Sequence, residues 1–276
     1  MKGGNNFMDL TVLFPVASGA IGGAISSGAI NGPIQTLNDC WYNYIGHYFS
    51  ESAKLRKIQE EHNVEKFKEE LKSDLQQIKP ENLQSPRRSI MNRTMEVSIH
   101  YLDEEEIRKI FSRLIAASMD SSKNKTAHNA FVEITKQMSP LDAQNLKLFS
   151  NNKCLPIVRI VSHPSHTELE YSILEDNVFL ENHQYSDFRH IASSLTNLER
   201  MGLIKITYNS WEDYSSRFAG TATYEKFGYS EPFISIRNAK ASKNTEVSID
   251  RGIIEITPFG EDFINVCLTS PQQTLA

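Results

Sequence analysis

The sequence has 276 residues, 39 % of them apolar and 23 % charged, a globular composition with enough chain for two modest domains. Its three cysteines, Cys40, Cys154 and Cys267, are far apart and form no Cys-x-x-Cys pair, which excludes a disulfide framework and disfavours structural zinc. The formal charge is −5, and residues 139–276 carry the whole acidic excess, with 12 basic and 17 acidic side chains. Net electrostatic repulsion therefore disfavours binding of nucleic acid to this half of the chain.

The first predicted segment, residues 1–33, is rich in glycine and apolar residues. It has no signal-peptide pattern, so a cytoplasmic protein is expected, with attachment to the inner membrane left open. Leu10–Asn38 contains 29 consecutive uncharged residues, and the mean hydropathy of Leu10–Ile30 is roughly 1.6, at the threshold for a membrane span.

Glycines in this segment recur at a spacing of four residues, which on a helix gives a flat face for close helix packing. Two interpretations stay open. The segment is a passive arm or ordinary packed helix, or it contacts a membrane or further copies of itself. The residues proposed for that contact are Gly19, Gly23, Gly28, Gly32, Ile21 and Ile25.

Residues 34–150 are predicted to form a helical domain, because apolar positions recur at helical spacing throughout. Asp103 is the predicted N-cap of a helix over 104–119, which has three glutamates in its first turn. The other predicted helices span 34–49, 50–78, 88–101 and 127–138, and a further helix opens at Ser139-Pro140.

Residues 151–276 change to the alternating period of strands. Strands are predicted at 154–162, 168–174, 203–208 and 246–257, and helices at 188–201 and 258–268. Gly202 ends a helix in a left-handed turn before a strand, and Thr257 and Gly260 open the last helix. This order predicts a winged-helix-like domain with a long aromatic-rich insertion at 209–245, and hence an α+β fold in which it follows the helical domain.

Two groups of side chains contain residue types that could bind a metal or transfer a proton. His163, His166, Glu168 and Glu170 contain metal-ligand types, but they lie in a predicted loop, so a solvated loop is favoured over a metal site. His128 and Glu133 lie five apart, on different sides of a helix, so acid–base catalysis is disfavoured. No phosphate-binding or hydrolase motif is present, and no cofactor is expected.

The helix over 188–201 would be the recognition helix of a winged-helix DNA reader. Its basic side chains are Arg189, His190 and Arg200, and acidic Asp187 and Glu199 lie among them, so no basic stripe forms. A protein-interaction or structural module is therefore favoured over nucleic-acid binding.

Four blocks of sequence, in order, carry a family resemblance: DEEEIRKIFSRLIAASMD, HNAFVEITKQMSPLDAQNLKLF, LTNLERMGLI and ITPFGEDFINVC. They resemble the abortive infection alpha family of bacterial proteins over about residues 50–268, most specifically over 103–149. The resemblance implies defence against phage, in which an infected cell stops growing or dies before phage matures. It supplies no catalytic residues, and the glycine-rich stretch is not part of it.

Three hypotheses follow. The leading one is a non-enzymatic defence protein whose N-terminal segment acts at a membrane or by self-association and whose C-terminal domain binds a protein partner. The second is a winged-helix regulator that binds nucleic acid, and steeply salt-dependent DNA binding would favour it. The third is an enzyme with a hidden site, for instance a nuclease using scattered carboxylates.

Overall fold

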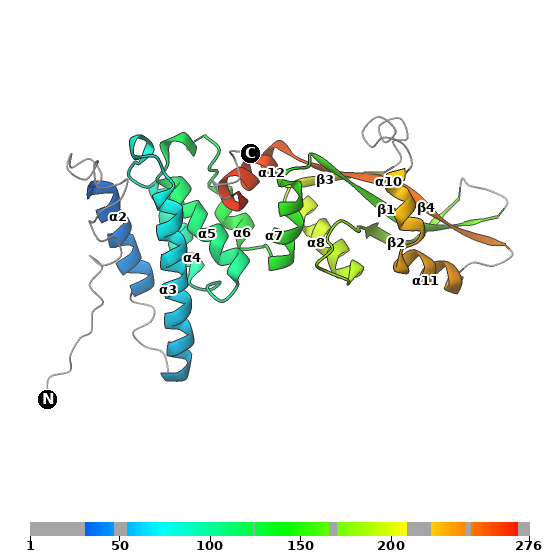
Figure 1. Cartoon of the computed structure of the whole chain (residues 1–276), viewed down its shortest axis with the longest axis horizontal. Helices are drawn as coiled ribbons and strands as arrows, with labels where there is room; N and C mark the ends of the chain where they lie inside the picture. Colours follow the sequence, from blue (N-terminus) through cyan, green and yellow to red (C-terminus); the bar gives the residue numbers. More distant parts are fainter. Residues whose placement is uncertain are drawn as a thin grey trace. The chain divides into compact units, whose positions relative to one another are not determined.

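The computed structural model describes residues 31–46, 54–123, 125–165, 170–208, 222–240 and 244–269. The chain divides into two compact units. The first runs to Pro140 and takes up the chain again from Asn265, and the second comprises Leu141–Ile264 (Figure 1).

The first unit is helical. Its elements are α2 (Asn31–Trp41), the π-helical turn η2 (Tyr42–Gly46), α3 (Lys54–Gln76), the 3-10 turns η4 (Pro80–Asn82) and η5 (Ser121–Lys123), α4 (Arg88–Ser98), α5 (Glu105–Ser118) and α6 (Ala130–Thr135). The π-helical turn η7 (Ile264–Leu268) leads the chain back into this unit.

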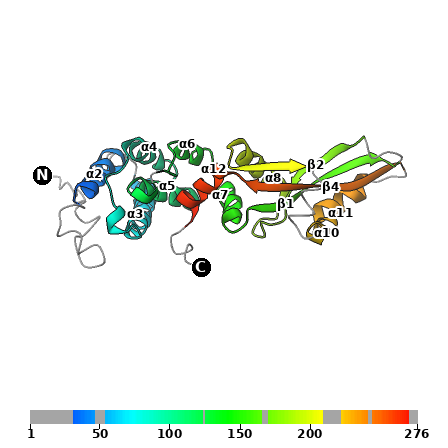
Figure 2. The ribbon, with the colours of Figure 1, turned by 90° about the horizontal axis from the view of Figure 1, so that it is seen from above.

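Helix α5 is the centre of this unit and packs against both α3 and α4 (Figure 2). Its buried positions include Ile107, Ile110, Phe111 and Leu114, which recur at three- and four-residue spacing and make one apolar face. The helix begins one residue later than predicted, and its N-cap is Glu104 without a side-chain bond. The amide of Glu104 donates to the carbonyl of Tyr101, and this turn keeps the predicted cap, Asp103, outside the helix.

Helix α2 is held to the rest of the unit by an apolar face. Leu37, Trp41 and Ile45 are buried, and the Trp41 ring stacks on Phe67 of α3 with centroids 5.6 Å apart. Cys40 Sγ lies 3.5 Å from Asn92 Oδ1 on α4. The segment that precedes α2 in the sequence is therefore joined to a well-packed helix.

The second unit contains a four-stranded antiparallel sheet in the order β2-β1-β4-β3. Its elements are α7 (Pro140–Lys147), η6 (Leu148–Ser150), β1 (Cys154–Pro164), β2 (Ser172–Val178), α8 (Phe188–Arg200), β3 (Ile204–Tyr208), α10 (Ala222–Gly228), α11 (Glu231–Lys240), β4 (Thr245–Ile256) and α12 (Pro258–Phe263). The long pair β1–β4 runs from Cys154 opposite Glu255 to Pro164 opposite Thr245. The predicted mixture of helices and antiparallel strands is thus confirmed.

One strand lies further along the chain than predicted. The expectation was 168–174, and β2 occupies Ser172–Val178, because polar residues in its second half have specific partners. Asp176 pairs with Arg159 of β1 at 2.8 Å, and Asn177 adopts a left-handed φ of 54° while its Oδ1 accepts from Tyr208 Oη at 2.8 Å. Pairing between β1 and β2 is irregular there, as in a bulge.

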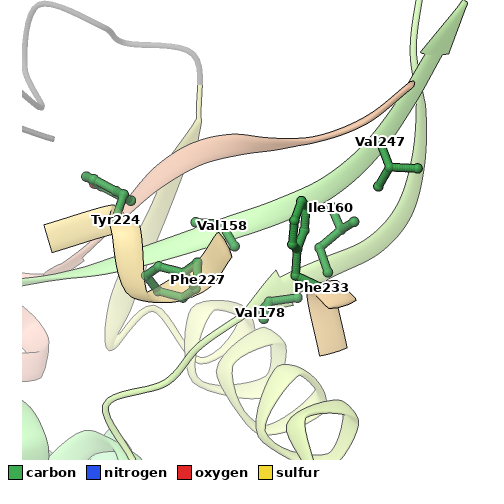
Figure 3. Close-up of a cluster of buried hydrophobic side chains, with 7 residues drawn as sticks. All are labelled: Val158, Ile160, Val178, Tyr224, Phe227, Phe233 and Val247. Carbon is green, nitrogen blue, oxygen red and sulfur yellow. The ribbon is translucent and has the colours of Figure 1, made fainter. Parts of the chain in front are cut away.

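The aromatic insertion supplies the core over one part of the sheet. Within 209–245 the structure describes α10 and α11, and their aromatic side chains point toward the strands (Figure 3). Tyr224, Phe227 and Phe233 pack with apolar side chains of β1, β2 and β4, and Tyr224 Oη also donates to the carbonyl of Gly252 at 2.9 Å. The insertion is therefore part of the folded unit.

The three residues expected to mark the wing meet at one junction. Gly202 has the predicted left-handed backbone, with φ of 74°. Thr257 is the N-cap of α12: its hydroxyl accepts from the amide of Gly260 at 2.9 Å and donates to the carbonyl of Gly202 at 2.7 Å. A Cβ at Gly260 would lie 2.0 Å from the carbonyl oxygen of Leu203, so only glycine fits.

Candidate functional site

The N-terminal residues singled out by sequence fall mostly outside the described ranges. Gly19, Ile21, Gly23, Ile25 and Gly28 are among the residues not described, and Gly32 lies in the first turn of α2. Within the described ranges, no helix is both long enough and apolar enough to cross a bilayer.

The histidine clusters have ordinary surroundings where they are described. His163 Nε2 lies 3.1 Å from Ser248 Oγ across β1 and β4, while His166 and Glu168 are outside the described ranges. Among the residues that the structure places, no three His, Cys, Asp or Glu side chains gather as a metal site requires.

His128 and Glu133 are both described by the structure. The His128 ring contacts Phe131 edge-on at 5.4 Å, and Glu133 forms an exposed ion pair with Lys136 at 3.0 Å. These two contacts are with different residues.

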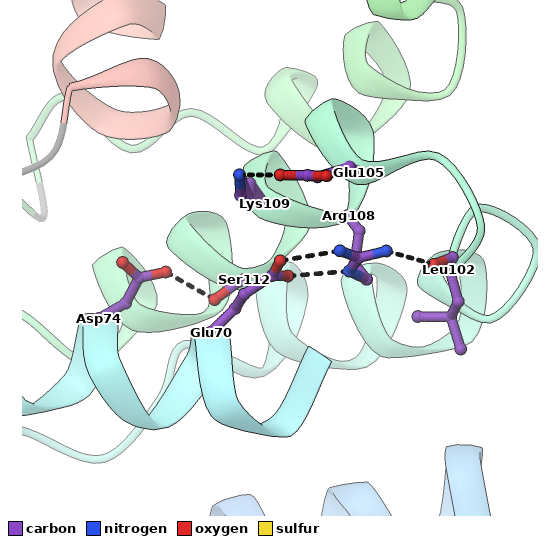
Figure 4. Close-up of polar contacts among 7 residues, drawn as sticks. All are labelled: Glu70, Asp74, Leu102, Glu105, Arg108, Lys109 and Ser112. Carbon is purple, nitrogen blue, oxygen red and sulfur yellow. Dashed lines mark hydrogen bonds and ion pairs between the residues drawn. The ribbon is translucent and has the colours of Figure 1, made fainter. Parts of the chain in front are cut away.

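A polar seam of hydrogen bonds and ion pairs joins α3 and α5 (Figure 4). Arg108 bonds both carboxylate oxygens of Glu70, with Nε to Oε2 at 3.0 Å and Nη2 to Oε1 at 2.9 Å. Its Nη1 donates to the carbonyl of Leu102 at 2.7 Å. The fork geometry suits a carboxylate, and the Arg108 side chain is only 4 % exposed, so the pair joins the two helices in a desolvated setting.

One turn further along both helices, Ser112 donates its hydroxyl to Asp74 Oδ2 at 2.6 Å. Burial raises the pKa of the Asp74 carboxyl, and the charge of Glu70 adds to this, while the Ser112 bond and the nearby cations Arg113 and Lys123 lower it. The net direction is upward because desolvation is the largest effect.

Beyond Asp74 the seam opens into a cavity of about 310 Å³ in the same unit. Its polar lining comes from the end of α3, from α5 and from η5, and Thr269 follows η7 at its edge. The lining residues are Asp74, Gln77, Ile78, Lys79, Asn82, Arg113, Ala116, Ala117, Asp120, Ser122, Lys123 and Thr269.

Arg113 ties the returning C-terminal segment to α5. Its Nη1 donates to the carbonyls of Cys267 and Leu268 at 3.1 and 3.0 Å. The Nε of Arg113 and the Oε1 of Gln77 are buried and have no hydrogen-bond partner among the described residues. Both atoms are enclosed by protein and have almost no accessible surface, so they carry the cost of unpaired buried polar groups.

The acidic lining residues, in contrast, already have protein donors. Asp120 Oδ1 accepts from the amide and the hydroxyl of Ser122 at 2.9 and 2.6 Å, and Asp74 is held by Ser112. Cys267, close to the same cations, is fully enclosed, and burial raises the pKa of its thiol far above the ordinary value, which leaves it protonated and unreactive.

Sequence reasoning did not identify this site. Glu70 and Asp74 are four residues apart on one helix, as are Arg108 and Ser112 on another, so each pair lies on one helix face. The four-residue spacing could have predicted a polar contact between two helices. It did not, because a charged helix such as α3 is typical of a solvated surface.

The family comparison covers most of the chain. A family model described as abortive infection alpha matches residues 59–267, which include the α3–α5 seam, the four strands and every cavity-lining residue except Thr269. No curated protein and no solved structure matches the chain significantly. The uncharged N-terminal run lies before the matched residues.

Proposed function

The chain belongs to the abortive infection alpha family, a phage-defence family, and we propose that it acts without catalysis, through its N-terminal segment and through partner contacts. One observation carries the non-enzymatic part. The ionisable side chains of the polar seam serve to join segments: Arg108 to Glu70 and Leu102, and Arg113 to the chain at Cys267 and Leu268. Such side chains are structural links, and their loss would alter packing before it altered a chemical step.

The effector in this proposal is Leu10–Ile30. Twenty-one residues at about 1.5 Å rise would span about 31 Å as a helix, close to the thickness of a bilayer core. The run contains no charge to bury in hydrocarbon, and the pairs Gly19/Gly23 and Gly28/Gly32 favour helix association in lipid. Pro15 and three serines favour an interfacial position or insertion after a trigger, with a cytoplasmic resting state at or near the inner membrane.

The attachment of α2 supports coupling between this segment and the folded unit. Because Leu37, Trp41 and Ile45 are buried, α2 is fixed to the helical unit, and the uncharged run continues directly into its first residues. A segment that enters a membrane would therefore bring the helical unit to the membrane surface.

The test compares phage protection and membrane recovery in cells that express full-length variants. Ile21→Asp with Ile25→Asp should abolish both, whereas the matched change Ile21→Leu with Ile25→Leu should preserve both. Gly23→Leu with Gly28→Leu should keep membrane recovery and impair protection, because leucine blocks close helix packing. If the aspartate variant protects as well as the parent, the segment is passive and the effector lies elsewhere.

We further propose that α8, β3, β4 and α12 form a winged-helix-like module that binds protein, in preference to the runner-up function of binding nucleic acid. The basic side chains of α8 have local partners: Arg189 pairs with Glu175, His190 with Asp187, and Arg200 bonds Asn197. The ion pair of Arg189 weakens its attraction for phosphates, and the other two side chains are already engaged in local bonds. Nanomolar, salt-sensitive binding of duplex DNA by the full chain would favour the regulator hypothesis instead.

A further inference from the structure

We propose that two copies of the chain pair through the outer edge of β2, as antiparallel strands with Ser172 on the two-fold axis. Strands β2 and β3 are the two edges of the four-stranded sheet. An edge strand carries a row of unpaired backbone groups that can pair with another strand. This proposal is independent of the membrane action proposed above, because it uses neither the N-terminal segment nor the helical unit.

The edge of β3 is closed by a side chain of its own unit. Glu199 of α8 accepts a hydrogen bond from the amide of Ile206 at 2.7 Å, and β3 is only five residues long. This carboxylate would have to be displaced before a second strand could pair there. Short strands and charged side chains are the usual means by which proteins protect an edge, so β3 is protected against strand addition.

The edge of β2 has no comparable cover among the residues that the structure describes. The strand is seven residues long, and the one side chain that bonds its backbone is its own Asp176, which accepts from the amide of Asn177 at 2.9 Å. The first half is the more open part: Ser172 is exposed, and Tyr171 and Ile173 are each 47 % exposed. An open and partly apolar edge is a template for another strand.

The charges of β2 allow a second copy to approach. Its acidic side chains are Glu175 and Asp176, and both are paired within their own unit, Glu175 with Arg189 and Asp176 with Arg159. Two β2 strands therefore meet as nearly neutral edges, whereas like charges directly opposite each other would oppose pairing. A neutral edge also gives a charged peptide little advantage, which favours a second copy as the partner.

The order of the side chains makes this edge self-complementary. Leu174 packs against the buried cluster that contains Phe227, so Tyr171 and Ile173 point to the other face of the sheet. In an antiparallel pair centred on Ser172, Tyr171 of each copy lies opposite Ile173 of the other. Pairs of an aromatic and a β-branched residue are favourable across strands, and the two-fold axis forms this pair twice.

The experiment is sedimentation equilibrium of the full-length protein at increasing concentration in physiological salt. We expect a monomer–dimer equilibrium with a dissociation constant of about 10–100 µM, because one strand edge buries less surface than a stable dimer does. Ile173→Lys should weaken dimerisation about tenfold or more, since lysine on an edge opposes strand pairing. Ile234→Lys is the matched control at an exposed isoleucine of α11, and it should dimerise like the parent.

Ser172→Cys tests the predicted axis. Directly opposite residues of an antiparallel pair have Cβ atoms about 4.5–5.5 Å apart, close enough for two cysteines to be joined with a small adjustment. Under mild oxidation this variant should give a covalent dimer in much higher yield than the parent or Ser235→Cys, a matched change at an exposed serine of α11. Hydrogen–deuterium exchange in β2 should also slow as concentration rises, whereas exchange in β3 should not change.

Three results would each overturn the proposal. The first is a parent protein that stays monomeric up to about 500 µM, well above the expected dissociation constant. The second is equal dimerisation by the parent and Ile173→Lys. The third is a yield of covalent dimer from Ser172→Cys no higher than that from Ser235→Cys.

Discussion

Gly202 and Gly260 lie at the same junction, yet alanine should have very different effects at the two positions. At Gly202 the backbone is left-handed, with φ of 74°, but a Cβ would have no heavy atom within 4 Å. At Gly260 a Cβ would lie 2.0 Å from the carbonyl oxygen of Leu203 and 2.5 Å from Ile256 Cδ1. Alanine at 202 is disfavoured only by its backbone conformation, whereas alanine at 260 clashes with the backbone of Leu203.

The magnitudes follow from these geometries. A non-glycine residue in the left-handed region costs about 1–2 kcal/mol, so Gly202→Ala should lower the free energy of unfolding by that amount. Overpacking typically costs about 1–3 kcal/mol, and displacing Leu203 would also disturb the bonds that its carbonyl accepts from Thr257. Gly260→Ala should therefore cost about 3–5 kcal/mol.

Urea unfolding of the full chain, followed by pulsed hydrogen–deuterium exchange, measures this difference. Peptides from β4 report on the second unit and peptides from α5 on the first, so the two units are followed separately. The control is Gly228→Ala, because a Cβ there also has no close neighbour and φ is not left-handed. The predicted contrast is wrong if the free energy of unfolding of Gly260→Ala lies within about 0.5 kcal/mol of that of the parent. It is also wrong if Gly202→Ala lowers the free energy of unfolding more than Gly260→Ala does.

Three further substitutions test the packing and the seam. Arg108→Met should lower the free energy of unfolding by about 2–3 kcal/mol, because it leaves the partly buried carboxylate of Glu70 without its partner. Adding Glu70→Met should recover part of that loss in a double-mutant cycle. Asp74→Asn should stabilise the protein at pH 7, because the pKa of Asp74 is raised in the folded state. Stability of the parent therefore falls as pH rises from the unfolded pKa, about 3.9, through the raised pKa of the folded state. In thermal melts the difference in melting temperature between variant and parent should vanish near about pH 3, and a difference that stays constant with pH would contradict the prediction. Phe227→Ala should lower the free energy of unfolding by about 3–5 kcal/mol, because the Phe227 side chain is fully buried. Hydrogen–deuterium exchange should become faster in β4 and stay unchanged in α5.

The parts of the fold that local chemistry determines were accessible from sequence. The left-handed turn at Gly202 follows from a glycine between a helix and a strand, and it is confirmed. The start of α7 at Pro140 likewise follows from the preference of proline for a first helical turn. Both rules need only neighbouring residues.

The position of β2 depends on residues far away in the chain, and local patterns missed it. Asn177 takes its left-handed conformation where Tyr208, 31 residues later, donates to its side chain. Helices α10 and α11 were also not predicted individually, because the burial of Phe227 and Phe233 depends on the sheet that they cover. Such contacts become visible only when the strand order is known.

The candidate site was inaccessible for a related reason. Sequence spacing places Glu70 and Asp74 on one helix face, but it does not say which face meets α5. The cavity cations, Lys79, Arg113 and Lys123, come from three segments that approach only after the helices pack. A motif search needs fixed spacing within one segment, and here the spacing is set by tertiary structure.

The packing of α2 determines where the N-terminal segment can be removed without damage to the rest. Deletion of residues 1–30 leaves Leu37, Trp41 and Ile45 in place, so it isolates the contribution of the uncharged run before α2. A deletion to residue 50 would also remove the ring that stacks on Phe67 and expose the apolar sides of α3 and α4. Loss of phage protection after the longer deletion would therefore report on unfolding, whereas loss after the shorter one, with an unchanged melting temperature, reports on the segment itself. The two deletions together separate an effector role for Leu10–Ile30 from a merely structural role for α2.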